Sequence, residues 1–140
     1  MNDVSATTQA FEPAAHGWER VQAHNFGELV GPIWRKGDPL FGFVATEKHA
    51  NHINIVHGGM LATFADQAMG MTAMRATGGK THATIELNIQ YIDAVKIGEF
   101  VEAHCDVVRI TRSIIFVRST LKVGDRIVAA ASGVWKILQR

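Results

Sequence analysis

Two parts of the chain, His57-Gly58-Gly59 and Asp66, carry residue types that suit attack on a carbonyl group. The two glycines stand where a loop enters a predicted helix, so their N–H groups are unobstructed and lie at the positive end of the helix dipole. Such donors stabilise a carbonyl oxygen that gains negative charge. We therefore expect Gly58 and Gly59 to bind the reacting group. A tight turn with close helix packing is the alternative.

Asp66 stands beyond the first turn of an apolar helix, where the dipole no longer favours a carboxylate. A carboxylate in that place needs a partner or a function. As a nucleophile or a general base, Asp66 would attack a carbonyl carbon or activate water. The alternative is that it faces solvent or pairs with Arg75 or another arginine near a subunit contact.

The spacing of these two groups has a consequence for assembly. Gly58 and Asp66 are eight residues apart, which is about 12 Å along one helix. An attacking group must come within about 3.5 Å of the carbonyl carbon while the N–H donor stays about 3 Å from its oxygen. We therefore expect each site to combine Gly58 of one chain with Asp66 of another, which requires at least a dimer.

The helix that carries these groups is predicted over His57–Thr77. The segment is rich in Ala, Met and Leu, has no proline, and ends at Gly78 and Gly79. Its polar residues Thr63, Asp66 and Gln67 fall on one stripe, and apolar residues occupy nearly every other side. We therefore expect the helix to be buried nearly all round. Met60, Met69 and Met71 are candidates to line an apolar pocket.

After the helix, the hydrophobic period changes to that of β-strands. Ala83, Ile85, Leu87, Ile89 and Tyr91 alternate with polar residues, which predicts a strand with one buried face. Further strands are expected near 40–47, 99–110, 113–122 and 127–138, the last two joined at Gly124-Asp125. The predicted fold class is α+β, with a mostly antiparallel sheet that curls around one long helix.

The N-terminal part carries weaker signals. Residues 1–16 have only scattered apolar positions and predict a flexible arm, so the single domain is expected over 17–140. A short helix is expected between Gly17 and Asn25.

Length and composition exclude several classes of protein. The 140 residues suffice for one core, and 14 Lys and Arg nearly balance 13 Asp and Glu, which argues against nucleic-acid binding. The single cysteine, Cys105, forms no intrachain disulfide and is expected in the core. No signal peptide or membrane-spanning stretch is recognisable, so we expect a cytoplasmic protein without membrane contact.

The segment NHINIVHGGMLATFADQAMG, which starts at Asn51, and the strands after it resemble one family. The resemblance is to the hotdog-fold acyl-CoA thioesterases of the phenylacetate-degradation and 4-hydroxybenzoyl-CoA thioesterase kind. It implies a long central helix wrapped by a curved antiparallel sheet, and hydrolysis of an acyl-CoA or aryl-CoA to the free acid and CoA. It also implies that Asp66 is the catalytic carboxylate, that sites span a homodimer or homotetramer, and that no metal or redox cofactor is needed.

Further site residues follow from the resemblance. Asn51 matches an Asn that positions the thioester or the attacking water, and Thr84 matches a Ser or Thr near the catalytic carboxylate. Arg109 and Arg112 fall in a turn whose basic residue approaches the CoA phosphates in relatives. His57 would donate a hydrogen bond to the substrate. Each residue also has a structural alternative. Asn51 would cap a loop, and Thr84 would be an ordinary strand residue. Arg109 and Arg112 would be solvated turn residues, and His57 would be a structural histidine.

Three other interpretations stay open. A hotdog hydratase or dehydratase would use His57 and Asp66 as an acid and base pair, and a binding domain would hold acyl-CoA without cleaving it. A metal site at His49, His52 and His57 is the third, although no carboxylate or cysteine completes a known ligand pattern there. Asn54 stands where the family often has a glycine, and we expect it to adopt the same left-handed backbone.

Overall fold

A computed structural model describes residues 11–138 of the chain. It contains two α-helices, two 3-10 helices and seven strands: η1 (Pro13–His16), β1 (Glu19–Arg20), α1 (Phe26–Val30), β2 (Trp34–Arg35), β3 (Leu40–Val44), η2 (Glu47–His49), α2 (Gly58–Ala76), β4 (His82–Tyr91), β5 (Phe100–Ile110), β6 (Ile114–Val123) and β7 (Arg126–Ile137). Within the described part, no helix combines the length and apolar character needed to cross a membrane.

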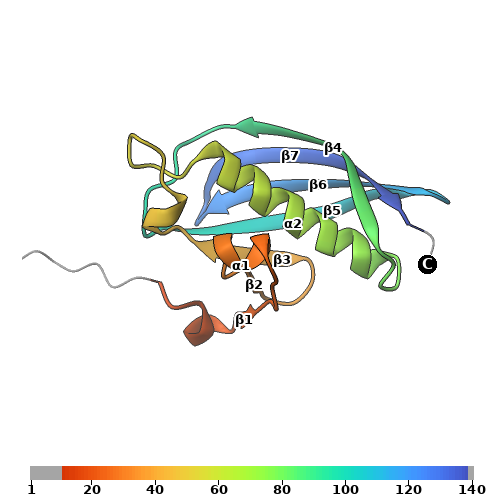
Figure 1. Ribbon diagram of the computed structural model, residues 1–140, viewed down its shortest axis with the longest axis horizontal. Helices are drawn as coiled ribbons and strands as arrows, with labels where there is room; N and C mark the ends of the chain where they lie inside the picture. The colour runs from red at the N-terminus through yellow and green to blue at the C-terminus, as the bar shows by residue number, and fades with distance from the viewer. Residues whose placement is uncertain (1–10, 139–140) are drawn as a thin grey trace, which may run out of the picture.

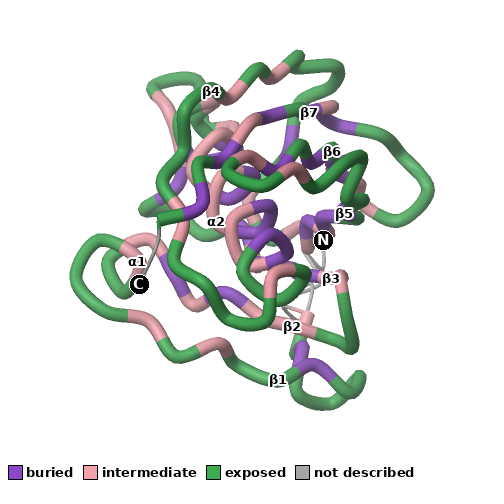
Figure 2. The backbone as a smooth tube through the Cα atoms, turned by 90° about the vertical axis from the view of Figure 1, so that its right-hand side faces the viewer, coloured by how far each residue is buried: buried purple, intermediate pink, exposed green. Residues whose placement is uncertain are grey.

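All seven strands form one antiparallel sheet in the order β1-β2-β3-β5-β6-β7-β4. The helix α2 lies across one face of this sheet (Figure 1). In the view turned by 90°, the strands from β4 to β3 arch around α2, and the buried residues of the strands lie toward the helix (Figure 2). The predicted α+β architecture, with a long helix and a large curved antiparallel sheet, is confirmed.

The core lies between α2 and the concave face of the sheet. Phe64 of α2 packs edge-on against Phe43 of β3, with ring centroids 4.7 Å apart, and both side chains are fully buried. Trp135 of β7 and Met69 of α2 are also buried. Because these side chains fill the space between α2 and the strands β3 and β7, their packing sets the distance of α2 from the sheet.

The burial of α2 differs from the expectation. Eight of its residues are buried, but the stripe that contains Thr63, Asp66 and Gln67 continues through Gly70 and Met71 and is only half-buried. The helix is therefore not covered all round. A cavity opens along this stripe because β4 and the N-terminal segment flank the helix there without closing over it.

The strand β4 also departs from its predicted pattern. It is an edge strand, bonded to β7 on one side alone within the described residues. Its pairing shifts between Thr84 and Glu86, which leaves Ile85 unpaired and exposed. Leu87 and Ile89 pack partly against the core, whereas Ala83, Ile85 and Tyr91 are exposed. The expected buried face is thus limited to the middle of the strand.

The N-terminal expectations were wrong where the structure describes them. Phe11 and Pro13 do not belong to a loose arm, because Pro13 is buried and the ring of Phe11 lies 4.5 Å from that of Phe100. Residues 1–10 of the predicted arm lie outside the described residues. No helix forms over 17–25, since the N–H of Val21 donates to the carbonyl of Ile33 and draws the segment along the sheet edge.

Candidate active site

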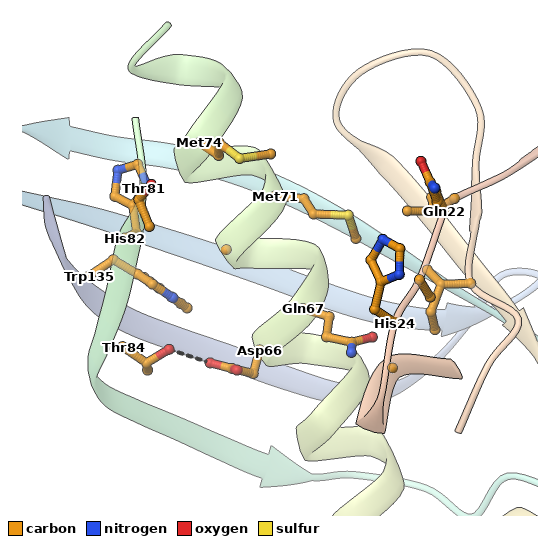
Figure 3. A pocket seen from close by; sticks show the side chains of 15 residues that line it. Gln22, His24, Asp66, Gln67, Met71, Met74, Thr81, His82, Thr84 and Trp135 are labelled. Atoms are coloured by element: carbon orange, nitrogen blue, oxygen red, sulfur yellow. Dashed lines mark hydrogen bonds between the residues drawn. The ribbon is translucent and has the colours of Figure 1, made fainter. Parts of the chain in front are cut away.

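Asp66 and Thr84 form the polar centre of the site. The hydroxyl of Thr84 on β4 donates a hydrogen bond to Oδ1 of Asp66 on α2 at 2.7 Å (Figure 3). The other carboxylate oxygen, Oδ2, has no hydrogen-bond partner among residues 11–138. Asp66 is half-buried and lines the cavity beside the helix. One oxygen is thus held in place while the other is available to a substrate or a water.

The ion pair considered for Asp66 does not form within residues 11–138 of one chain. Arg75 pairs instead with Asp38, Nε to Oδ2 at 3.1 Å, near the end of α2. The carboxylate of Asp66 therefore has no cationic partner in the described part of this chain.

The cavity beside Asp66 has a volume of about 420 Å³. Figure 3 shows Gln67 and Met71 of α2 directed toward His24 of the N-terminal segment, across the cavity. Apolar surface from Met74 and Trp135 completes much of the wall. A mostly apolar cavity with a few polar side chains, next to an available carboxylate oxygen, is suited to hold the group attached to a reacting carbonyl.

The first turn of α2 leaves one backbone donor free. The N–H of Gly59 donates to Nδ1 of His57 at 2.8 Å, while those of Met60 and Leu61 bond to the carbonyl of His57. The N–H of Gly58 has no acceptor among the described residues. Gly58 therefore offers the single unsatisfied N–H at the positive end of the helix dipole, whereas the N–H of Gly59 is already bonded within the chain.

His57 acts as the N-terminal cap of α2. Because its Nδ1 accepts the hydrogen bond from Gly59, a neutral ring carries its proton on Nε2. The side chain is exposed, and Nε2 has no partner in the described part of the chain. The ring thus has a structural role through Nδ1, and its Nε2–H remains available as a donor.

Tyr91 is a contact that the sequence pattern did not reveal. Its hydroxyl donates to the carbonyl oxygen of Gly58 at 2.9 Å, over 33 residues of sequence. A Cβ atom at position 58 would lie 3.1 Å from the phenol ring, closer than side-chain atoms normally approach. A side chain at position 58 would therefore crowd Tyr91, because the last residue of β4 packs directly on the start of α2.

Asn51 shapes the loop that leads into α2. Its side-chain oxygen accepts hydrogen bonds from the N–H groups of Ile53 and Ile55, at 3.0 and 3.3 Å. This bonding favours the loop-capping interpretation, and a role for Asn51 in orienting water or thioester stays a prediction. Asn54, in the same loop, has the expected left-handed backbone with φ 63°.

Gly58 and Asp66 do not meet within one chain. They lie in the same continuous helix, eight residues apart, so the free N–H and the free carboxylate oxygen are separated by about 12 Å along its axis. The structure of a single chain therefore holds two half-sites.

Comparison with known proteins identifies the family. The sequence model of the thioesterase superfamily matches residues 53–130, more than half of the chain. The chain belongs to the thioesterase superfamily. The predicted thioester hydrolase and the predicted family are confirmed.

The relatives of this thioesterase agree with that assignment. A protein of Pseudomonas aeruginosa named "Putative esterase PA0474" is 30% identical over 115 residues, covering 79% of this chain and 86% of its own length. Human acyl-coenzyme A thioesterase 13 is 29% identical over 83 residues, which is 56% of this chain and 59% of the human protein. A Bacillus halodurans protein solved with CoA superposes with a TM-score of 0.75 at 28% identity, covering 84% of this chain and 78% of that one.

Arg109 and Arg112 lie at the opposite end of the chain's fold from Gly58. Both are exposed, at the end of β5 and in the turn to β6. That turn lies at the end of the sheet where α2 ends, whereas Gly58 begins the helix at the other end (Figure 1). Within one chain of this thioesterase, the arginines are therefore remote from the free N–H of Gly58, and their contact with CoA phosphates stays a prediction.

Of the three methionine candidates for the pocket, the structure places one in the cavity. Met71 lines the cavity, but Met60 and Met69 are buried in the core, and Met74 lines the cavity in their place. The sequence reasoning also missed the wall formed by residues 21–27 and the side chain of His82. No sequence signal marked residues 21–27, because they lie outside the segment that resembles the family, whereas His82 begins β4, within that segment.

The structure also shows the surroundings of Cys105 and of His49, which the sequence had offered as part of a metal site. Cys105 is buried as expected, and burial raises the pKa of its thiol, so it stays protonated and unreactive. Nδ1 of His49 accepts a hydrogen bond from the N–H of Thr46, and its Nε2 bonds to the carbonyl of Val30. No group of three or more potential metal ligands occurs among residues 11–138.

Proposed function

We propose that this thioesterase hydrolyses an acyl-CoA or aryl-CoA to the free acid and CoA, at a site built from two copies of the chain. The observation that carries the proposal is the pair of complementary half-sites, the free N–H of Gly58 and the free Oδ2 of Asp66. Each is suited to one side of a carbonyl group, and they are too far apart in one helix to act together. The acyl-CoA thioesterase among the relatives and the neighbour solved with CoA support the substrate class.

In this site the thioester oxygen accepts a hydrogen bond from Gly58 of one copy. Asp66 of the other copy acts as general base or as nucleophile. As a base, it takes a proton from water, whose oxygen adds to the carbonyl carbon. As a nucleophile, it forms a mixed anhydride that water then cleaves. In both routes the C–S bond breaks, the sulfur leaves as the CoA thiolate, and the acid is released.

The edge of β4 is suited to join the two copies. An unpaired edge strand offers its N–H and C=O groups to another strand, and this one carries exposed Ile85, Tyr91 and, just beyond it, Ile92. The same strand holds Thr84 against Asp66 and Tyr91 against Gly58. Pairing through β4 would bring the half-sites of both copies toward one interface.

The cavity beside Asp66 would receive the acyl or aryl group. It opens next to the available carboxylate oxygen, and its wall combines the apolar surface of Met71, Met74 and Trp135 with a few polar side chains. The CoA part would extend away over the surface, where Arg109 and Arg112 are candidates to contact its phosphates.

The activity is tested by thiol release from short, medium, long and aromatic acyl-CoAs, with Asp66→Asn as the variant. This substitution keeps the size of the side chain and its contact with Thr84 but removes the base or nucleophile. We expect kcat to fall by about 10²–10⁴-fold. Asp106→Asn, at an exposed position on β5, is the matched control. Binding of acyl-CoA by the wild-type protein without thiol release would contradict hydrolysis and favour a binding domain, whereas hydration of an enoyl-CoA would favour the hydratase.

The shared site is tested by mixing two inactive variants. Asp66→Asn lacks the carboxylate, and Gly58→Pro lacks the N–H. A mixed dimer of the two has one intact site and one site lacking both groups, so random exchange of subunits should restore about a quarter of the wild-type activity. A mixture no more active than its components would place both groups in one chain. Each variant alone, after the same exchange step, is the control.

A further inference from the structure

Arg126, the first residue of β7, makes a three-partner contact with the connection between β4 and β5. Its Nε lies 3.2 Å from Oδ2 of Asp93, and its Nη2 lies 2.9 Å from Oε2 of Glu99. The same Nη2 donates to the carbonyl of Ala94 at 3.2 Å. One guanidinium therefore holds both ends of residues 93–99, which we call the β4–β5 connection.

The β4–β5 connection bonds in turn to the loop that precedes α2. The N–H of Val56 donates to the carbonyl of Val95 at 2.8 Å, and Ile55 forms an isolated β-bridge with Lys96. The side chain of Val95 is 1% exposed, so this contact is anchored in the core. Val56 is two residues before Gly58. The position of the free N–H of Gly58 thus depends on the place of the β4–β5 connection.

A second contact joins the same region to α2. Tyr91, two residues before Asp93, donates to the carbonyl of Gly58 at 2.9 Å. The β4–β5 connection and Gly58 lie at the same end of the molecule, where β4 ends and α2 begins (Figure 1). Residues 91–99 therefore contact Gly58 and the residues just before it, and Arg126 is the charged group that holds Asp93 and Glu99 in this segment.

We propose that Arg126 is a positioning residue for the oxyanion donor: through Asp93 and Glu99 it fixes the β4–β5 connection, and through that connection the N–H of Gly58. The inference rests on the proposed function, because Gly58 matters only if it binds the thioester oxygen. Without the guanidinium, two carboxylates that both lie against it would be left close together and would repel each other. A shift of a fraction of an ångström at Gly58 then lowers the rate, since oxyanion stabilisation depends steeply on geometry.

If Arg126 only stabilised the fold, its substitution would give different kinetic results. The side chain of Arg126 is 40% exposed, and exposed ion pairs contribute little to the free energy of unfolding. A positioning role lowers kcat more than it changes KM, and it loosens the hydrogen bonds next to Gly58. A surface ion pair without such a role changes neither.

The test compares Arg126→Gln and Arg126→Lys with the wild-type dimer. We expect Arg126→Gln to lower kcat by about tenfold with little change in KM, and amide hydrogen exchange at residues 55–57, whose N–H groups are bonded, to become faster. Arg126→Lys keeps one charge and should restore part of the kcat. Arg75→Gln is the matched control, because its ion pair with Asp38 has similar exposure and lies at the other end of α2.

The outcomes separate the two proposals. If the wild-type protein releases thiol and Arg126→Gln does so with an unchanged kcat, or with unchanged exchange at residues 55–57, the positioning role is overturned while the proposed function stands. If the wild-type protein releases no thiol from any acyl-CoA, the proposed function fails and the positioning role falls with it. Should Arg126→Gln not fold, Asp93→Asn removes one of the two ion pairs and is expected to give a smaller loss of kcat in the same direction.

Discussion

The hydroxyl of Thr84 donates a hydrogen bond to the carboxylate of Asp66 at 2.7 Å, across 18 residues of sequence. This bond joins the edge strand β4 to the middle of α2, and it occupies Oδ1 of Asp66. Because Oδ2 has no partner in the described part of the chain, the bond orients the carboxylate and leaves its second oxygen open to the cavity. In the proposed site, Thr84 therefore leaves Oδ2 as the oxygen available to a substrate.

Removing this hydroxyl should lower the rate of hydrolysis. Thr84→Val keeps the shape of the side chain but loses the donor, so the carboxylate is free to rotate. We expect kcat to fall by about tenfold, in line with the worth of a hydrogen bond to a charged group. Thr84→Ser retains a hydroxyl and should stay near the wild-type rate. Equal kcat for the Val and Ser variants, measured by thiol release, would show that the bond has no role in catalysis.

Loss of the N–H of Gly58 is expected to lower kcat more than the addition of a side chain at this position. Gly58→Pro removes the N–H, and proline is tolerated at the first position of a helix. The preceding residue, His57, already has the extended backbone that a following proline requires, with φ −61° and ψ 135°. We expect kcat to fall by about a hundredfold.

Gly58→Ala is the control for this variant. It keeps the N–H and adds the same Cβ, which would approach the ring of Tyr91 in either variant. A loss in Gly58→Ala as large as that in Gly58→Pro would assign the effect to crowding against Tyr91, and the N–H would no longer be a supported oxyanion donor. Circular dichroism on both variants checks that α2 is retained.

Stability should decrease as the pH falls below the ordinary histidine value. Burial lowers the pKa of His49, against the opposing effect of its hydrogen bond to Val30 and together with the nearby charge of Lys48. Burial also lowers the pKa of His82. As the pH falls through 6.5, the unfolded chain therefore binds protons that the folded chain does not, and the free energy of unfolding decreases.

Urea unfolding at pH 7.5 and 5.5 measures this dependence. His49→Gln removes one titrating group, so the difference in unfolding free energy between the two pH values should become smaller than in the wild-type protein. The variant also loses hydrogen bonds to Thr46 and Val30, which lowers stability at both pH values. An unchanged difference would show that His49 is not a source of the pH dependence.

Two methionines of α2 should respond differently to truncation. Met69 is fully buried, so Met69→Ala should cost about 2–5 kcal/mol in the free energy of unfolding. Met71 is half-buried and faces the cavity, so Met71→Ala should cost less and shift the preference among acyl-CoAs toward bulkier groups. Thermal unfolding and the kcat/KM profile of the acyl-CoA panel check both. The same profile for Met71→Ala and the wild type would place the acyl group elsewhere.

Much of the fold followed from the sequence because it depends on local patterns. The helical pattern before residue 80 predicted α2, and the strand patterns after it predicted the four long strands. The bounds agree to within about two residues. The motif at His57 and the spacing to Asp66 also predicted two groups that cannot meet in one helix. These properties depend on neighbours in the chain, so the sequence alone was enough to infer them.

The contacts between distant segments were decided by the tertiary structure. The bond from Tyr91 to Gly58 spans 33 residues, and the cavity wall at residues 21–27 meets α2 only because the N-terminal segment follows the sheet edge. The bulge at Ile85 changes which side chains of β4 face the core. Such contacts depend on strand register and on how the whole sheet curves around the helix, and every strand contributes to that curvature. No local pattern contains this information, so it became visible only in the folded chain.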